Sequence, residues 1–293
     1  MGLLVVGLVA CGFQSEAART HDAADAPATC DLVCGLNATC TVVGTAGCRC
    51  DPGFSGDGRA CSDVDECTAG TSGCPGACLN TTGGFTCYAP RTCADVKAMI
   101  PTATDRTYTL YLDGDASKPW TADCARMTTT PVEYLSLAGT NLAQYTAGGK
   151  ASGTTVTTTY TKVRFAPASH QIDISDRTFA TSRGRVNHPM SGQPNIVVTS
   201  MPYGVAMDCA GAGKDTGVAQ IDLSGTHFAL MDRQQFATQG NGAAGKVELS
   251  SSRQQAKVTG GGSCGWTAPI GGPQNPFNDN VGNGVLLELA YVP

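Results

Sequence analysis

Charged side chains are scarce in this sequence. Of its 293 residues, 15% are charged, against about 25% in an average soluble domain. The 24 acidic residues outnumber the 19 basic residues, which gives a net charge of −5. No basic stripe offsets this balance, so the sequence does not predict a nucleic-acid partner. Only four histidines are present, and none begins the H-E-x-x-H pattern of zinc peptidases.

The sequence also lacks a long apolar run. The N-terminal stretch MGLLVVGLVACG is shorter than the ~20 apolar residues that span a bilayer. It resembles a bacterial lipobox, which implies a signal peptide over residues 1–11 and a lipid on Cys11. Residues 12–29 are polar and alanine-rich and predict a flexible linker. We therefore expect an exported protein, lipid-anchored at a bacterial outer membrane, cell surface or periplasm. An ordinary export signal with a spare cysteine is the alternative.

The cysteines are distributed unevenly. Of the 15 cysteines, 11 lie between Cys30 and Cys93, and the rest of the chain after Cys93 holds only Cys124, Cys209 and Cys264. Setting Cys11 aside leaves an even number, which is consistent with full pairing in an oxidising compartment. A dense run followed by a sparse one predicts small disulfide-stapled modules ahead of a larger domain with its own core.

The first six of these cysteines show an ordered spacing, C-x3-C-x5-C-x7-C-x-C-x10-C, over residues 30–61. The spacing alone allows 15 pairings. The order and the ending CDPGFSGDG resemble an EGF-like domain. That resemblance implies the pairs Cys30–Cys40, Cys34–Cys48 and Cys50–Cys61.

A second pattern follows, in which DVDEC (residues 63–67) precedes CLNTTGGFTC (residues 78–87). It resembles a calcium-binding EGF-like domain, truncated here to residues 63–88 because the last cysteine pair is missing. The resemblance implies the pairs Cys67–Cys78 and Cys74–Cys87, with Phe85 packed on the preceding module. It also implies a Ca²⁺ site of the oxygen ligands that this ion prefers: side chains of Asp63, Glu66 and Asn80, and carbonyls of Val64, Thr81 and Gly84. A metal-free acidic turn is the alternative.

Residues 93–293 predict a large all-β domain with little helix. Thr92 can cap a short helix, and strands are expected over residues 108–112, 133–137, 154–165, 171–174, 196–199, 218–223, 227–230 and 285–292. A return strand is also expected to begin at Pro119 and Trp120. The segments YTLYLDGD, KPWTADC, GVAMDC and GSCGW resemble a GON domain, the C-terminal module of some ADAMTS metalloproteases. The remaining disulfides expected are Cys93–Cys124 and Cys209–Cys264. The Asp-Gly-Asp at residues 113–115 has turn chemistry rather than the character of an acid/base pair.

We interpret the chain as a surface-anchored binding or adhesion protein rather than an enzyme. Calcium would stiffen the stalk of EGF-like modules, and the GON domain would recognise an extracellular protein or glycan. One rival is a zinc-binding hydrolase with its metal at His170, Asp173 and His188; the other is a purely structural surface protein. The asparagine-rich residues 275–283 could hold a second Ca²⁺, although turns that satisfy their own backbone explain them as well.

Overall fold

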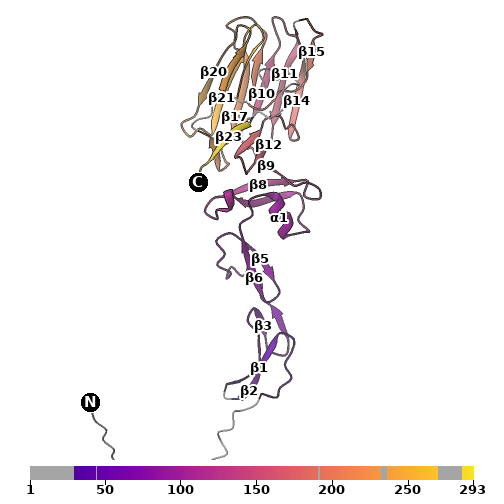
Figure 1. The fold of residues 1–293 in the computed structure, drawn as a ribbon, viewed down its shortest axis with the longest axis vertical. Helices are drawn as coiled ribbons and strands as arrows, with labels where there is room; N and C mark the ends of the chain where they lie inside the picture. Colours follow the sequence, from indigo (N-terminus) through magenta and orange to yellow (C-terminus); the bar gives the residue numbers. More distant parts are fainter. Residues whose placement is uncertain (1–29, 44, 191, 232–235, 270–285) are drawn as a thin grey trace, which may run out of the picture. The chain divides into compact units, whose positions relative to one another are not determined.

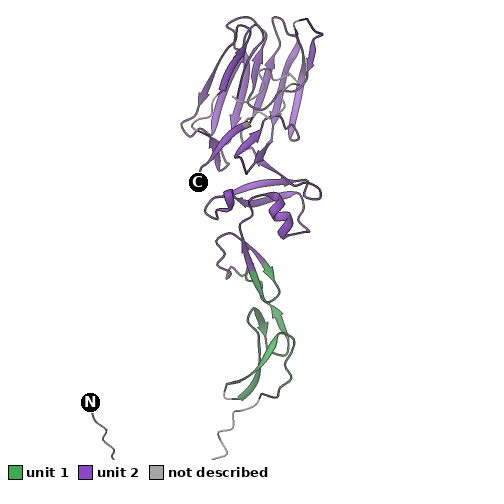
Figure 2. Ribbon diagram, in the orientation of Figure 1, with its two compact units in different colours: residues 1–69, 80–85 green, residues 70–79, 86–293 purple. Residues whose placement is uncertain are grey.

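The computed structural model describes residues 30–43, 45–190, 192–231, 236–269 and 286–293. Cys11, the predicted linker 12–29 and the asparagines of residues 275–283 lie outside these ranges. The chain divides into two compact units, one of residues 1–69 and 80–85 and the other of residues 70–79 and 86–293 (Figure 2). Within the described residues, no helix has the length and apolar character needed to cross a membrane.

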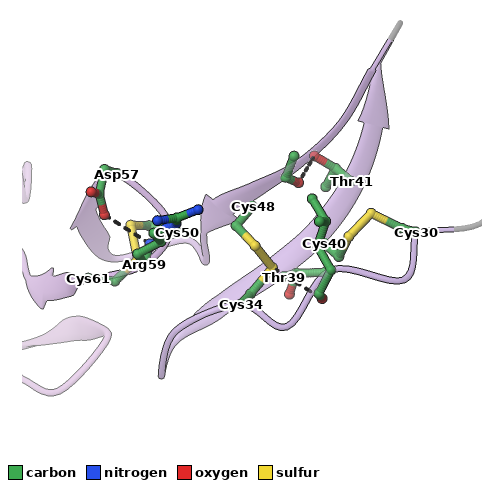
Figure 3. Close-up of a disulfide and its surroundings, with 12 residues drawn as sticks. Cys30, Cys34, Thr39, Cys40, Thr41, Cys48, Cys50, Asp57, Arg59 and Cys61 are labelled. Atoms are coloured by element: carbon green, nitrogen blue, oxygen red, sulfur yellow. Dashed lines mark hydrogen bonds between the residues drawn. A yellow bond between two sulfur atoms is a disulfide. The ribbon is translucent and has the colours of Figure 1, made fainter.

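The first unit is held by disulfides rather than by a core. Strands β1 (Ala38–Val43) and β2 (Thr45–Cys50) form one antiparallel hairpin, and β3 (Phe54–Gly56) pairs with β4 (Cys61–Asp63) in another. The bonds Cys30–Cys40, Cys34–Cys48 and Cys50–Cys61 cross-link them (Figure 3). These are the pairs that the EGF resemblance implies. So short a segment cannot bury enough apolar surface, and covalent links replace a core.

A third hairpin, β5 (Ala77–Thr81) with β6 (Gly84–Tyr88), follows in the chain. Cys74 is bonded to Cys87, and Cys67 and Cys78 are also both in disulfides. The chain continues from β6 into the large domain without a further cysteine pair. There the Pro90 carbonyl accepts a hydrogen bond from the Tyr111 N–H at 2.8 Å.

The large domain opens with its only described α-helix, α1 (Cys93–Met99). Thr92 caps the helix: its side chain accepts from the Asp95 N–H, and the Asp95 carboxylate accepts from the Thr92 N–H. This capping box agrees with the helix expected from the sequence. The Cys93–Cys124 disulfide ties the helix to strand β8.

One sheet of the large domain has seven strands, in the order β18-β23-β13-β12-β9-β8-β7. Its strands are β7 (Arg106–Tyr111), β8 (Pro119–Ala125), β9 (Val132–Ser136), β12 (Lys162–Ala166), β13 (Gln171–Asp173), β18 (Phe228–Leu230) and β23 (Leu286–Tyr291). Every pair in it is antiparallel. A 3₁₀ turn, Leu112–Gly114, follows β7 and reverses the chain, so this stretch is a strand, a turn and a return strand.

The other sheet has ten strands and branches. Its path runs β15-β14-β11-β10-β16-β22-β19, while β17 pairs with β10 and carries β21 and β20 beside it (Figure 1). The strands are β10 (Leu142–Thr146), β11 (Ser152–Tyr160), β14 (Ala180–His188), β15 (Ile196–Val198), β16 (Ala206–Asp208), β17 (Gly217–Asp222), β19 (Phe236–Gly240), β20 (Ala244–Leu249), β21 (Gln255–Gly261) and β22 (Gly265–Pro269).

Glycines let the two branches of this sheet touch backbone to backbone. A Cβ on Gly217 would lie 2.3 Å from the Met207 nitrogen, and one on Gly260 would lie 2.4 Å from the Thr267 nitrogen. No side chain fits in such a gap, which explains why glycine occurs within these strands.

Apolar side chains of both sheets form one continuous core. Trp120 of β8 is 1% exposed. Its ring meets Phe165 and Phe228 edge-on, with centroids 5.2 and 5.5 Å apart. The fold class expected from the sequence, disulfide-rich modules followed by a large all-β domain, is confirmed.

The predicted strand over residues 154–165 is wrong. Residues up to Tyr160 belong to β11 in the ten-stranded sheet, and Lys162 begins β12 in the seven-stranded sheet. At the break, the Thr161 N–H donates to the Phe179 carbonyl. The run of β-branched residues carries no glycine or proline to mark this crossing. The prediction also omitted β10, β14, β16, β19, β20, β21 and β22.

Candidate calcium site

The residues of the expected calcium site come from two separate stretches of the first unit. Asp63 ends β4, and Val64 and Glu66 follow it directly. Asn80 and Thr81 end β5, and Gly84 begins β6. The second stretch therefore flanks the turn of the β5–β6 hairpin. All six residues belong to one compact unit.

The Asp63 carboxylate joins the two stretches. Its Oδ2 accepts a hydrogen bond from Asn80 Nδ2 at 2.8 Å, and its Oδ1 accepts from the Gly83 N–H at 2.6 Å. A carboxylate that receives two donors has a fixed orientation, since each bond constrains one oxygen. The same bond orients the Asn80 amide: its Nδ2 faces the Asp63 carboxylate, and its Oδ1 does not.

Two side-chain oxygens of the expected ligands are buried and unsatisfied. Glu66 Oε2 and Asn80 Oδ1 have no hydrogen-bond partner among the described residues. Leaving a buried acceptor unpaired costs about 1–3 kcal/mol, more for a charged one. Carboxylate and amide oxygens are ligands that Ca²⁺ accepts. The donor set and its two unpaired oxygens therefore fit this cation.

The loop is anchored to the preceding EGF-like module through Phe54. The Val64 N–H donates to the Gly53 carbonyl at 2.9 Å. A Cβ on Gly83, where φ is +80°, would lie 2.9 Å from Phe54 Cε2, so only glycine allows this aromatic ring to lie so close. The packing of Phe85 on that module stays a prediction, and its side chain is 39% exposed.

The residues of the predicted zinc site do not come together. His170 precedes β13 in the seven-stranded sheet, whereas His188 ends β14 in the ten-stranded sheet. His170 Nε2 lies 3.3 Å from Asp113 Oδ1. Asp173 Oδ1 accepts from the N–H and hydroxyl of Ser175 at 3.0 and 2.6 Å. The Asp173 carboxylate therefore already accepts hydrogen bonds within its own turn.

His188 has a different set of neighbours. Its Nδ1 lies 2.7 Å from the Tyr145 hydroxyl and 3.9 Å from Cys209 Sγ. His188, Cys209 and Cys264 are the one group of three potential metal-ligating side chains that gathers within 4.8 Å in the described part of the chain. The two sulfurs are bonded to each other, however, and metals bind the thiolate form. Burial lowers the pKa of His188, which favours a neutral imidazole packed in the core.

Two glycine patterns in the large domain match catalytic motifs by spacing alone. Residues 261–265 (GGSCG) fit the nucleophile pattern G-x-S-x-G, and residues 240–245 (GNGAAG) fit G-x-G-x-x-G. The first motif requires a strand–turn–helix and the second a strand followed by a helix. Here the first lies between β21 and β22 and the second between β19 and β20. Both are strand–turn–strand connections, so neither match carries its chemistry.

Comparisons with known proteins match two stretches of the chain. The family model of the calcium-binding EGF domain matches residues 63–98, and that of the GON domain matches residues 142–272. The chain carries a calcium-binding EGF domain and a GON domain. The EGF match contains both stretches of the calcium site. The GON match contains every strand of the ten-stranded sheet.

Curated relatives match short segments of the chain. Mouse thrombomodulin is 43% identical over 61 residues, 20% of this chain and 10% of the relative. Mouse uromodulin is 51% identical over 57 residues, 18% and 9% of the two chains. Vacuolar-sorting receptor 6 of Arabidopsis thaliana is 50% identical over 50 residues, 16% and 8%. The chain thus spans about a tenth of these relatives. No solved structure matches.

The EGF domains and the disulfides indicate an extracellular or secreted protein. Every cysteine from Cys30 to Cys264 is disulfide-bonded, and most of these bonds lie in the modules that precede the GON match. Such bonds persist in oxidising compartments. The calcium-binding EGF domain also indicates Ca²⁺ as a ligand. The concentration of Ca²⁺ outside the cell is high enough to fill sites of modest affinity.

Proposed function

We propose that this protein is an extracellular adhesion or recognition protein in which calcium orders the EGF stalk and the GON domain binds the partner. The observation that carries the proposal is the pair of buried, unpaired oxygens on Glu66 and Asn80. They belong to the two stretches that the Asp63 carboxylate joins, and a cation would give both oxygens a partner. The ligands we propose are the side chains of Asp63, Glu66 and Asn80 and the carbonyls of Val64, Thr81 and Gly84.

Calcium would act here as a cross-link. It would join the segment after β4 to the β5–β6 hairpin, next to the Phe54–Gly83 contact. A ligand that binds only the ordered arrangement stabilises it by mass action, by about 2.7 kcal/mol at a hundred times its Kd. The stalk would then be stiff in a calcium-rich medium and loose after chelation. A stiff stalk presents its terminal domain at a fixed distance from whatever carries it.

The GON domain is the proposed recognition head, with an extracellular protein or glycan as partner. Loops join the strands of its branched sheet, and binding residues commonly occupy such positions on a rigid β-scaffold. The rival of a zinc-binding hydrolase receives no support from the arrangement of His170, Asp173 and His188. A purely structural surface protein is the remaining rival, and it predicts no saturable partner.

The test is solid-phase binding of the full chain to immobilised laminin, fibronectin and their deglycosylated forms. Binding should be saturable in millimolar calcium and weaker with a chelator. Saturable binding that does not change with the calcium concentration would refute the proposed role of the calcium-ordered stalk in binding. Absence of saturable binding to all of these surfaces would refute the recognition function and favour the structural rival.

We also propose a lipid anchor at Cys11, which is supported by the residue pattern before it. Incorporation of labelled palmitate by a bacterial host should be lost in Cys11→Ser. Label retained by that variant would refute the anchor.

A further inference from the structure

The outer face of three neighbouring strands of the GON domain carries two rows of polar side chains. In the first row, Gln220 of β17 lies opposite Lys257 of β21, which lies opposite Glu248 of β20. In the second row, Asp222 lies opposite Gln255, and the Gln255 carbonyl accepts from the Ser250 N–H. We call these six residues the polar grid. The three strands are adjacent in Figure 1.

Strand alternation places the grid on the outside. Ile221 and Ala256 are 1% and 5% exposed and pack into the core. Their neighbours in sequence on either side therefore project from the opposite face. Lys257 and Gln255 are accordingly exposed, whereas Ala256 and Val258 between and beside them are buried.

The grid lines a hollow. It surrounds a shallow depression of about 460 Å³, with Thr140 at one side. This volume lies within the 300–1,000 Å³ typical of small-ligand sites. Leu249 also borders the hollow, but it lies opposite Ala256, so its side chain projects from the other face of the sheet.

Part of the grid is held rigidly from behind. Asp222 Oδ1 accepts from the N–H and the hydroxyl of Ser224, and Asp222 Oδ2 accepts from Gln255 Nε2 at 3.0 Å. The backbone of Asp222 is fixed by the fully buried Asn141, whose Oδ1 accepts from the Asp222 N–H at 2.7 Å and whose Nδ2 donates to the Asp222 carbonyl at 3.0 Å. Side chains held before binding lose little entropy when a ligand arrives.

Other members of the grid have unused hydrogen-bonding capacity. The Gln220 amide and the Lys257 ammonium make no hydrogen bond and no ion pair with the described residues. Glu248 is paired with Lys246 at 2.7 Å. Counting Lys246, the hollow and its rim hold two cations and two carboxylates, so their formal charges cancel. A site with balanced charge does not favour an anionic ligand over a neutral one.

We infer that the polar grid binds a neutral oligosaccharide. A sugar offers vicinal hydroxyls that both donate and accept, and the grid alternates acceptors (Asp222, Glu248) with donors (Lys257, the amides of Gln220 and Gln255). The rows are two residues apart on each strand, which is about 7 Å, so one pyranose ring can reach both. The inference rests on the proposed recognition function and names its site and ligand class.

The experiment is calorimetric titration of the full chain, in calcium, with neutral pentasaccharides: cellopentaose, maltopentaose, mannopentaose and chitopentaose. A heparin hexasaccharide serves as the anionic comparison. At least one neutral pentasaccharide should bind, and Gln220→Ala and Lys257→Ala should each weaken it by about tenfold or more, because each removes a hydrogen bond that the sugar makes. Gln239→Ala and Lys214→Ala are matched controls at exposed positions outside the grid and should bind like the wild type.

The outcomes separate the inference from the function on which it rests. Absence of binding by every neutral pentasaccharide, binding of heparin alone, or equal affinity of the grid variants and the wild type would overturn the inference. If the chain still bound laminin or fibronectin in that case, and the grid variants did too, the recognition function would stand with its site elsewhere. Near-ultraviolet circular dichroism of each variant ensures that a loss of binding does not reflect unfolding.

Discussion

Removing the charge of Asp63 should weaken calcium binding while leaving the fold of the loop in place. Asp63 accepts hydrogen bonds from Asn80 Nδ2 and the Gly83 N–H through its two oxygens. In Asp63→Asn, the remaining oxygen can still accept from one of these donors, so the shape of the loop is retained. The variant loses a negative charge and one of the anionic oxygens offered to the cation.

The magnitude follows from replacing a charged ligand by a neutral one. An interaction with a charged group contributes about 1.5–3 kcal/mol, and each 1.4 kcal/mol is a factor of ten. The Kd for calcium should therefore rise about 10- to 150-fold. The control is Asp57→Asn, which removes the same charge from an exposed turn of the same unit. The Asp57 carboxylate accepts from the Ala60 and Arg59 N–H groups, which lower its pKa, and it contacts none of the proposed ligands. Screening over about 8 Å at physiological salt should leave its effect below about threefold.

The assay is competition with a chromophoric chelator, using the full chain purified from an oxidising compartment in 0.15 M salt. Titrations of the wild type, Asp63→Asn and Asp57→Asn are compared at one pH. If Asp63→Asn and Asp57→Asn shift the Kd equally, the oxygen cluster is not the calcium site. If neither the wild type nor either variant binds calcium, the EGF domain of this chain has lost the function of its family.

Three further predictions concern the stability of the GON-containing unit. Gly260→Ala should destabilise it by about 1–3 kcal/mol or more, because the new methyl group meets backbone of β16 and β22. Urea unfolding measures this, and an unchanged midpoint would contradict the close approach of the backbones. Glu133→Gln should stabilise the chain more at pH 7 than at pH 4. Burial raises the pKa of Glu133, so the native state binds a proton that the unfolded state releases. The stability of the wild type therefore falls as the pH rises above the unfolded pKa of about 4.3, and the variant avoids this loss. Glu248→Gln should show the opposite trend, since hydrogen bonding to Lys246 lowers the pKa of Glu248; equal behaviour of the two variants would contradict the argument.

The parts of the structure that the sequence predicted are those encoded by neighbouring residues. The disulfide spacing of residues 30–61, the DVDEC segment and the Thr92 cap are all local patterns. Their meaning does not depend on distant chain segments, so they could be interpreted directly. The contact of Phe54 with Gly83 is not local, because it joins the first EGF-like module to the turn of the β5–β6 hairpin.

The GON domain resisted prediction because its pairing is long-range. Strand β10 borders β11, β16 and β17, so its neighbours include residues 206–208 and 217–222. The break after Tyr160 depends on which sheet each half of the run joins. The polar grid has the same origin, because Gln220, Lys257 and Glu248 become neighbours only through the register of three strands. The alternation of polar residues along one strand does not reveal which residues lie opposite them on the neighbouring strands.

Strand β23 also determines when this domain can fold. Residues 286–291 lie between β18 and β13, pairing with residues 228–230 on one side and 171–173 on the other. Until β23 has been synthesised, those two strands have open edges, and open edges recruit strands from other chains. Because their closing partner is more than fifty residues away along the chain, this sheet forms late and slowly. A chain that ended before β23 would keep these edges open, so we expect it to aggregate rather than fold into a shortened domain.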